Sequence, residues 1–315
     1  MSPNSPSKAS PSSHAEPSDG PIVSKPAVGE PKALAPGLYL VATPIGNLRD
    51  ITLRALEVLA SADVVACEDS RVTRKLLNAH GISARLTGYH EHNAERARPS
   101  LIKRMEQGNS VALVSDAGTP LISDPGHKLV REAAEAGLAI TVIPGASAPL
   151  AGLIASGLPS DRFLFAGFLP NKSAARRRDL ETLAAVPASL VFLESAKRLP
   201  QALADMATVL GPRPAAVARE LTKLHEELKR GSLAELAAHY AAAGPPKGEV
   251  VVVVGPGETR AALSDGDIDE LLKPALAEAS LRDAVANVVG ATGLPRRRVY
   301  KRALALSSGA AEDTP

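Results

Sequence analysis

The sequence has little of what would cross-link a fold or build an aromatic surface. Among 315 residues it has one cysteine, Cys67, no tryptophan and 3% aromatic residues. A single cysteine excludes an internal disulfide and a cysteine-based metal site, and is typical of a protein of the reducing cytoplasm. With so few aromatics, the core must consist of Ala, Leu and Val. An RNA surface would then depend more on arginine and phosphate than on base stacking.

Several sequence signals of other protein classes are also missing. No charged segment followed by an apolar stretch opens the chain, and no run is long enough to span a membrane, so we expect neither secretion nor insertion. The dinucleotide fingerprint GxGxxG, the phosphate loop GxxxxGK[ST], the HExxH zinc motif and the GxSxG nucleophile motif are absent, which excludes the commonest competing enzymes. The net charge of +2 does not by itself indicate a nucleic-acid partner.

The chain is predicted to contain a tail, two α/β domains and a helical appendix. Residues 1–36 are rich in Ser, Pro, Ala and Gly, and are predicted to be a disordered tail. Apolar runs then alternate with helical spacing through 37–145, which predicts an open parallel sheet with helices on both faces. Its expected strands are 37–43, 63–68, 84–89, 110–116 and 138–145, and its expected helices 51–62, 71–80, 93–107 and 128–137.

A second α/β domain is predicted over 146–258. Its expected strands are 163–167, 188–193, 214–218 and 249–255, with helices near 172–185, 197–209 and 232–242. Residues 259–315 are predicted to form a helical appendix. Within it, two short helices over 280–306 flank the turn Gly293-Leu294-Pro295 with helix-turn-helix spacing.

Three loops follow predicted strands of the first domain, where ligand sites of α/β proteins are usually found. They span 43–47, 115–126 and 143–148, and each combines small residues with proline. Small residues let the backbone approach a ligand closely, and proline reduces the ordering that binding requires. Each loop alone could be an ordinary turn, but three in one half of the chain predict a site for a polar ligand.

Several short runs of the sequence resemble those of a known protein family. The runs 43–48, 68–73, 115–126 and 144–148 look like the tetrapyrrole methylase superfamily of S-adenosylmethionine-dependent methyltransferases. More narrowly they look like the branch that methylates a cytidine ribose 2′-hydroxyl in the decoding region of small-subunit (16S) ribosomal RNA. Matching segments continue at 167–172, 193–198 and 218–227. The first loop reads Thr-Pro-Ile-Gly and the second Ala-Gly-Thr-Pro, which points away from the tetrapyrrole-binding branches.

The resemblance implies a fold, a cofactor and a set of contacts. It implies two α/β domains with S-adenosylmethionine in the cleft between them, and a homodimer. Carried over by position, the cofactor contacts are Pro44, Ala117, Gly118, Thr119, Ile122, Ser147, Ala148 and the backbone at Leu221.

Three residues are candidates for the chemistry, each with an alternative. Glu194 ends a predicted strand and could be the general base, or could orient Arg198 or a backbone amide. Asp116 could act near the cofactor or hold its loop. Lys172 could stabilise a developing alkoxide or grip phosphate, or could be a solvated lysine.

Other polar residues could likewise have either a functional or a structural role. Glu68, Asp69 and Arg71 could contact substrate or form a structural ion-pair network. His90 and His92 could contact RNA, but with no third ligand a metal site is not expected.

Two basic clusters bear on a nucleic-acid partner. One cluster opens a predicted helix of the second domain, and the other lies on the last predicted helix. Runs of like charge are often only solvated. A basic second helix in a helix-turn-helix, however, favours contact with phosphate. Three functions follow from these patterns: a ribosomal RNA ribose methyltransferase, a methylase of a tetrapyrrole or other small metabolite, and a non-catalytic nucleic-acid-binding protein. Under the first, the RNA contacts are Arg176, Arg177, Arg178, Arg296, Arg297, Arg298 and Lys301.

Overall fold

The structure is a computed structural model, and it describes residues 32–123, 126–257, 264–292 and 294–309. Most of the predicted tail, residues 1–31, lies outside this part. Residues 32–36 contain no helix or strand. The chain divides into two compact units, one made of 1–44 and 48–145 and the other of 45–47 and 146–315. Within the described ranges, no helix is long and apolar enough to cross a membrane.

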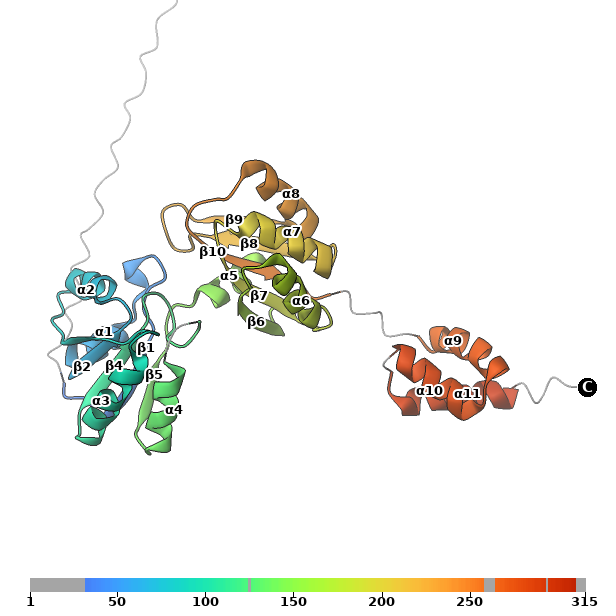
Figure 1. Cartoon of the computed structure of the whole chain (residues 1–315), viewed down its shortest axis with the longest axis horizontal. Coiled ribbons are helices and arrows are strands. Elements are labelled where there is room, and N and C mark those ends of the chain that lie inside the picture. The colour runs from blue at the N-terminus through green and yellow to red at the C-terminus, as the bar shows by residue number, and fades with distance from the viewer. Residues whose placement is uncertain (1–31, 124–125, 258–263, 293, 310–315) are drawn as a thin grey trace, which may run out of the picture. The chain divides into compact units, whose positions relative to one another are not determined.

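The first unit is a five-stranded, wholly parallel sheet with strand order β3-β2-β4-β1-β5 (Figure 1). Each crossover between its strands runs through a helix, as parallel neighbours require. The strands are β1 (Gly37–Val41), β2 (Val64–Cys67), β3 (Leu86–Gly88), β4 (Ser110–Val114) and β5 (Ile140–Ile143). The helices are the 3-10 helix η1 (Leu48–Asp50), α1 (Leu53–Ser61), α2 (Ser70–Ala79), α3 (Ala94–Glu106) and α4 (His127–Glu135).

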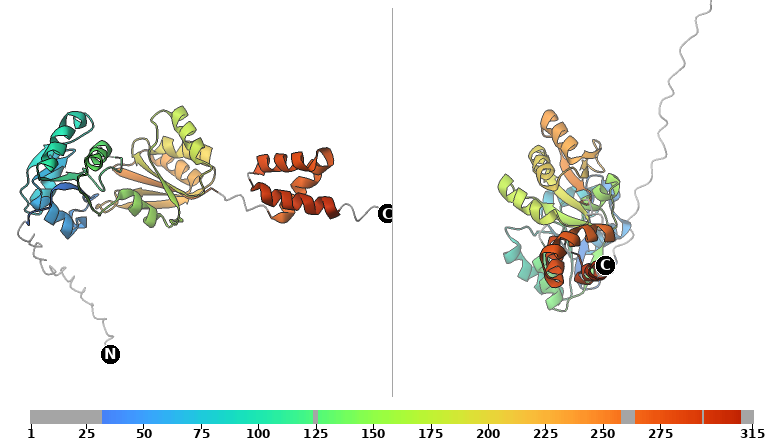
Figure 2. Two further views of the ribbon diagram at one scale, coloured as in Figure 1. Left: turned by 90° about the horizontal axis from the view of Figure 1, so that it is seen from below. Right: turned by 90° about the vertical axis from the view of Figure 1, so that its right-hand side faces the viewer.

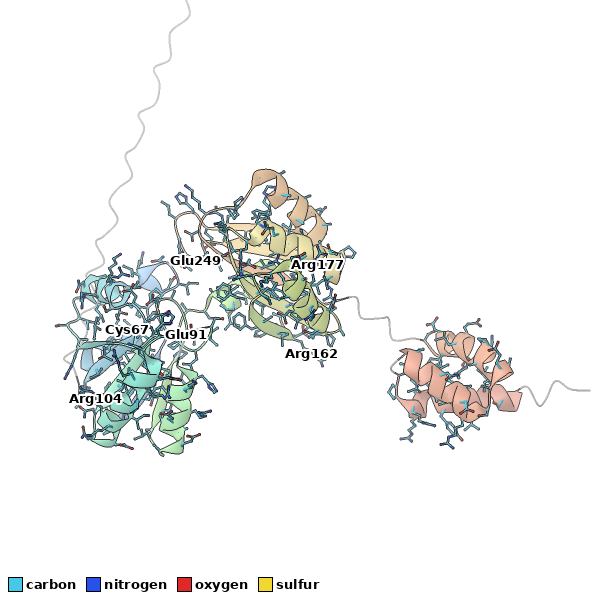
Figure 3. All side chains as sticks on the ribbon, in the orientation of Figure 1. Cys67, Glu91, Arg104, Arg162, Arg177 and Glu249 are labelled. Atoms are coloured by element: carbon cyan, nitrogen blue, oxygen red, sulfur yellow. The ribbon has the colours of Figure 1, made fainter. Side chains whose placement is uncertain are left out.

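Alternating side chains of this sheet build two separate cores. Tyr39 and Val41 of β1 pack with α1 and α2 on one face, whereas Leu38 packs with α3 and α4 on the other. This arrangement follows from the two-residue period of a strand. Cys67 is buried on the α1 side and is a free thiol (Figure 3). The predicted parallel sheet with helices on both faces is therefore confirmed.

The second unit contains a mixed sheet of order β6-β7-β10-β8-β9. Figure 2 shows the second unit from two further sides, with helices packed on its sheet. β6 pairs parallel with β7, and the other pairs are antiparallel. The strands are β6 (Phe163–Phe168), β7 (Ser189–Ser195), β8 (Pro214–Arg219), β9 (Glu227–Ser232) and β10 (Glu249–Val254). The helices are α5 (Ala148–Ser156), α6 (Ser173–Leu183), α7 (Leu199–Leu210) and α8 (Leu233–Ala243).

This sheet also has a core on each face. Leu190 and Phe192 of β7 pack with α6, α7 and α8, while Val191 packs with Leu153 of α5. Ile45, from the loop after β1, belongs to the α5-side core. The Thr43–Asn47 loop therefore begins in the first unit and ends in the second.

Two elements of this unit were not predicted from sequence. β9 reads Glu-Leu-Lys-Arg-Gly-Ser, which is polar because it lies at a sheet edge and buries little surface. α5 reads as a continuation of the small-residue loop before it. Its composition is apolar almost all round, so no helical period stands out.

The described residues of the appendix form three helices with a core of their own (Figure 1). They are α9 (Asp265–Glu278), α10 (Leu281–Thr292) and α11 (Arg296–Gly309). Ser264 and Asp267 form a reciprocal cap at the start of α9, which satisfies free backbone N–H groups there. The two helices expected around the turn correspond to α10 and α11, and α9 precedes them. Gly293 itself lies outside the described residues.

Candidate functional site

The carboxyl edge of the first sheet has the topology of a ligand site. β1 and β4 are neighbours, but α1 follows β1 on one face and α4 follows β4 on the other. The loops that leave these two strands therefore diverge. In open parallel sheets, ligands bind in the crevice that such a divergence leaves at the strand ends.

The loops after β1 and β4 are joined to each other by backbone and hydroxyl contacts. Thr43 and Gly118 form an isolated antiparallel bridge, with N–H···O distances of 2.9 and 3.0 Å. The Thr43 hydroxyl donates to the carbonyl of Ser115 at 3.1 Å, and the Ser115 hydroxyl donates to the carbonyl of Gly118 at 3.0 Å. Gly118 itself has φ of 83°, a conformation that glycine adopts without steric cost. The predicted contacts Ala117, Gly118 and Thr119 thus lie within or next to the segment 115–118, which these hydrogen bonds fix to Thr43.

Asp116 connects this loop to the end of β2. Its Oδ1 accepts a hydrogen bond from the backbone N–H of Asp69 at 2.9 Å. This contact matches the alternative in which Asp116 holds its loop and does not act near the cofactor. A depression of about 540 Å³ opens at the same edge. It is lined by Glu68, Asp69, Ser70, Arg71, Gly88, His90, Glu91, His92 and Asp116.

The pKa values of two acidic residues of this depression are shifted in opposite directions. Burial raises the pKa of Glu68, and the nearby Asp116 carboxylate raises it further. Hydrogen bonds from the side chain and backbone of Arg71 instead lower the pKa of Asp69 to about 2. Asp69 also caps α2 by accepting from the Arg71 backbone N–H. The ion pair between Asp69 and Arg71 therefore matches the structural alternative and not the substrate contact.

The two histidines of the depression contact each other edge to face. The rings of His90 and His92 lie 6.1 Å apart. In the part of the chain that the structure describes, no group of three or more His, Cys, Asp or Glu side chains could hold a metal ion.

Backbone strain marks two of the positions predicted to contact the cofactor. The non-glycine residues with positive φ in the described chain are Leu121, Ser123, Glu220 and Thr222, with φ from 51° to 72°. They flank Ile122 in one unit and Leu221 in the other. Such conformations cost on the order of 1–3 kcal/mol each and are retained where the surrounding structure holds them, often at ligand sites. Sequence reasoning did not find them, since none is glycine.

Leu221 lies against the end of the first loop, within the second unit. The Asn47 backbone N–H donates to the Thr222 hydroxyl at 3.1 Å. A Cβ at Gly46 would lie 3.0 Å from the Leu221 carbonyl and still closer to Thr222 and Lys223. Gly46 is thus required because residues 221–223 pack directly against it.

The remaining predicted contacts lie at the ends of strands and at the start of a helix. Pro44 is buried directly after Thr43. Ser147 is the N-cap residue of α5, and Ala148 is its first residue.

Glu194 is buried and ion-paired. Its side chain is 1% exposed, and Oε1 accepts from the Ser195 backbone N–H at 2.6 Å and from Arg198 at 2.6 and 2.8 Å. It lies on the same face of β7 as Leu190 and Phe192, which α6 to α8 cover. A general base must reach the proton that it removes, so these contacts match the alternative, in which Glu194 orients Arg198 and a backbone amide.

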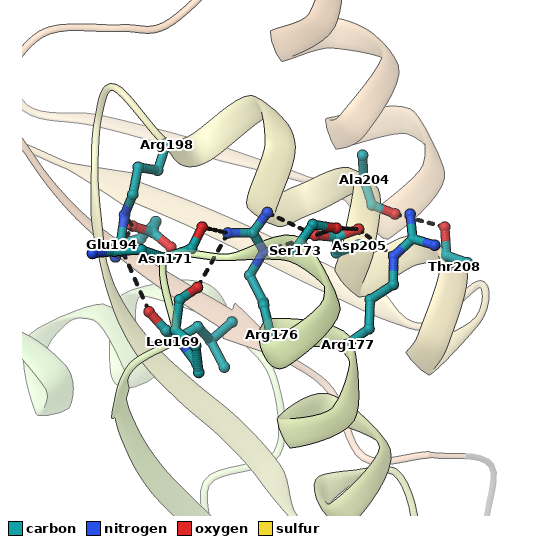
Figure 4. Close-up of polar contacts among 11 residues, drawn as sticks. Leu169, Asn171, Ser173, Arg176, Arg177, Glu194, Arg198, Ala204, Asp205 and Thr208 are labelled. Atoms are coloured by element: carbon teal, nitrogen blue, oxygen red, sulfur yellow. Dashed lines mark hydrogen bonds and ion pairs between the residues drawn. The ribbon is translucent and has the colours of Figure 1, made fainter.

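Arg176 is also buried, which differs from its predicted contact with RNA. It is 3% exposed, and its guanidinium binds Asp205 at 2.7 and 2.8 Å (Figure 4). Burial raises the pKa of Asp205, but hydrogen bonds from Arg177, Ser173 and Arg176 together outweigh it and leave that pKa below its usual value. Arg176 is held in the domain interior, so the prediction that it contacts RNA is wrong. A lone acid among the apolar residues of α7 was the signal that could have revealed this pair.

Loss of the buried ion pair between Arg176 and Asp205 is expected to destabilise the fold. Asp205→Ala is expected to lower the free energy of unfolding by about 3–5 kcal/mol, because it leaves the Arg176 charge buried without a partner. Arg177 binds the same carboxylate but is half exposed, so Arg177→Ala is expected to cost less than about 1 kcal/mol. Urea unfolding of both variants measures the difference. Equal losses would contradict this assignment.

The other predicted basic residues are exposed to different extents. Lys172 is the N-cap residue of α6, and Lys172 and Arg178 are both exposed. On α11, Arg298 binds Asp265 at 2.9 Å and is partly screened by it. Three other basic residues of α11 are exposed and form no ion pair with any described residue: Arg296, Arg297 and Lys301.

Comparison with known proteins identifies the class to which this fold and these loops belong. The family model described as Tetrapyrrole (Corrin/Porphyrin) Methylases matches residues 37–237. The solved structure of diphthine synthase has the same fold, with a TM-score of 0.55 at 19% identity, over 69% of this chain and 89% of that one. A uroporphyrin-III C-methyltransferase from Thermus thermophilus, complexed with S-adenosyl homocysteine, aligns over 70% of this chain and 97% of its own, with a TM-score of 0.50 at 22% identity.

Curated relatives narrow the assignment. "Ribosomal RNA small subunit methyltransferase I" of Mesorhizobium japonicum is 56% identical over 282 residues, which cover 89% of this chain and 96% of the relative. The protein of the same name from Escherichia coli O157:H7 is 44% identical over 85% of this chain and 94% of its own length. A second model, the RsmI C-terminal HTH domain, matches residues 262–307. The chain therefore belongs to the tetrapyrrole methylase family, and within it to the ribosomal RNA small subunit methyltransferase I family.

Proposed function

We propose that this protein transfers a methyl group from S-adenosylmethionine to the ribose 2′-hydroxyl of a cytidine in the decoding region of small-subunit (16S) ribosomal RNA. The observation that carries the proposal is the pairing of a methylase fold with the carboxyl-terminal domain of this one methyltransferase family in a single chain. Relatives of that name align along nearly their whole length. We further propose that it acts as a cytoplasmic homodimer.

The loops described above fit a polar cofactor such as S-adenosylmethionine. Gly118 has φ of 83°, its hydrogen bonds to Thr43 fix the loop after β4, and residues with positive φ flank Ile122 and Leu221. A fixed loop loses little conformational freedom on binding. The residues that would hold the cofactor are Pro44, Ala117, Gly118, Thr119, Ile122, Ser147, Ala148 and Leu221. When bound, it supplies an electrophilic methyl group on a sulfonium.

The chain's own contribution is to align the nucleophile. Holding a ribose hydroxyl in line for displacement can lower a barrier by roughly 7–11 kcal/mol. Asp116 acts indirectly, by fixing the loop after β4 to the end of β2. The exposed Lys172 provides a cation for a developing alkoxide or for a neighbouring phosphate.

Label transfer from S-adenosylmethionine to small ribosomal subunits that lack the modification tests the proposal. We expect label on one nucleotide, whose 3′ phosphodiester becomes resistant to alkali because alkaline cleavage needs a free 2′-hydroxyl. Label on an alkali-sensitive nucleotide would contradict ribose methylation. Cofactor binding without transfer to RNA would favour a methylase of a tetrapyrrole or other metabolite, and the absence of both would favour a non-catalytic binding protein.

A further inference from the structure

The surface loop Phe168–Lys172 is fixed from within the second unit by Arg198 (Figure 4). This guanidinium donates to the carbonyl of Leu169 at 3.3 Å and contacts the side-chain oxygen of Asn171. Glu194 holds Arg198 in place, so the buried carboxylate acts on the loop through the arginine.

A second arginine fixes the same loop from its other side. Arg176 donates to the carbonyl of Pro170 at 3.3 Å and to the carbonyl of Asn171 at 3.2 Å. Asp205 holds Arg176, and also accepts the hydroxyl of Ser173, the first residue of α6. The carbonyls of three consecutive residues, 169 to 171, therefore accept from guanidinium groups that buried carboxylates orient.

This arrangement fixes a loop more than it stabilises a core. Burying an ion pair costs desolvation, and apolar residues of similar volume often stabilise a fold as well or better. Here the donors that remain on both arginines are directed to one short segment. A segment fixed before binding loses less freedom when a ligand arrives.

The two ends of the fixed loop carry an exposed aromatic side chain and an exposed cation. Phe168 is 55% exposed and ends β6 at the start of the loop. Lys172 is exposed at the other end, and Arg178 is exposed in the first turns of α6. An aromatic face stacks on an unpaired base, and a neighbouring cation pairs with phosphate.

We propose that the loop Phe168–Lys172 is a subsite for one unpaired nucleotide of the RNA, with the base stacked on Phe168 and a phosphate bound by Lys172. The inference rests on the proposed function, because it assumes an RNA substrate. Glu194, Arg198, Arg176 and Asp205 are then positioning residues, which place this subsite without touching RNA.

The chain contains a matched control for stacking. Phe163 begins the strand that Phe168 ends, and it is 43% exposed. Six strand residues place the two rings on the order of 17 Å apart, so one nucleotide cannot contact both. Phe163 adjoins neither Lys172 nor the fixed loop in sequence.

The experiment is titration of the full-length protein with small-subunit ribosomal RNA at several salt concentrations, together with KM and kcat for methyl transfer. Phe168→Ala is expected to weaken binding about tenfold with an unchanged salt slope, because stacking releases no counterions. Phe168→Tyr is expected to restore affinity, and Phe163→Ala to leave it unchanged. Lys172→Ala is expected to reduce the slope of log K against log salt by about 0.7.

The positioning role has its own readout. Arg198→Ala is expected to raise KM, and its effect combined with Lys172→Ala is expected to be smaller than the sum of the two. Circular dichroism shows whether each variant is folded, and Arg198→Lys provides a milder substitution.

Two failures are distinguishable. If the wild-type protein transfers no methyl group to RNA, the proposed function fails. If it does, but Phe168→Ala binds RNA like Phe163→Ala, or changes only the sedimentation of the protein, the subsite is overturned and the proposed function stands.

Discussion

Replacing Gly118 with valine is expected to abolish binding of S-adenosylmethionine while leaving the first unit folded. Gly118 has φ of 83°, and both its N–H and its carbonyl bind Thr43. A β-branched residue is strained in this conformation, so the bridge and the loop after β4 must move. The cost, on the order of 1–3 kcal/mol, is smaller than the stability of a typical domain. Calorimetric titration with the cofactor measures the loss.

Gly108 is the matched control for this substitution. It has φ of 91°, and a Cβ there would meet no heavy atom within 4 Å. It precedes β4, at the opposite edge of the sheet from Gly118. Gly108→Val therefore introduces similar backbone strain away from the loops, and is expected to bind the cofactor normally. Tight binding by Gly118→Val would show that the site is not at the carboxyl edge.

Replacing Arg296, Arg297 and Lys301 with alanine is expected to weaken RNA binding by roughly 100-fold at 0.15 M salt. Three lost phosphate contacts would reduce the slope of log K against log salt by about two to three. Phosphate contacts position RNA without reading its sequence, so the loss is expected to be similar for unrelated RNAs. Filter binding at several salt concentrations tests both statements.

Arg298 is the control on the same helix. Its charge is already partly neutralised by Asp265, with which it forms an ion pair at 2.9 Å. Arg298→Ala is expected to change the salt slope much less, and to act mainly on the stability of the appendix by up to about 1 kcal/mol. An unchanged slope in the triple variant would mean that the basic face of α11 is only solvated.

The fold of the first unit could be predicted closely from sequence. Its strands are near-continuous apolar runs, as a sheet that is buried on both faces requires, and its helices have a clear apolar stripe. The predicted strands were too long at their carboxyl ends. The predicted strand 110–116 ends at Val114, because Ser115 and Asp116 leave the ladder: the Ser115 carbonyl accepts from the Thr43 hydroxyl, and the Asp116 carboxylate accepts from the Asp69 N–H.

The second unit was predicted less completely for physical reasons. An edge strand such as β9 needs no apolar alternation, because one side of it has no neighbouring strand. A helix such as α5, apolar almost all round, shows no period that separates it from a loop of small residues.

The sequence by itself determined the order of strands and helices in the first unit, the loops that follow its strands, and the family. These depend on local pattern and on motifs that are contiguous in the chain. Only the tertiary structure decided which charged residues are buried. Arg176 and Arg178 are two residues apart, yet Arg176 faces Asp205, 29 residues away, while Arg178 is exposed. The residue type determines whether a side chain carries a charge. Packing between distant segments determines its ion-pair partner, and that partner decides whether the charge can reach a ligand.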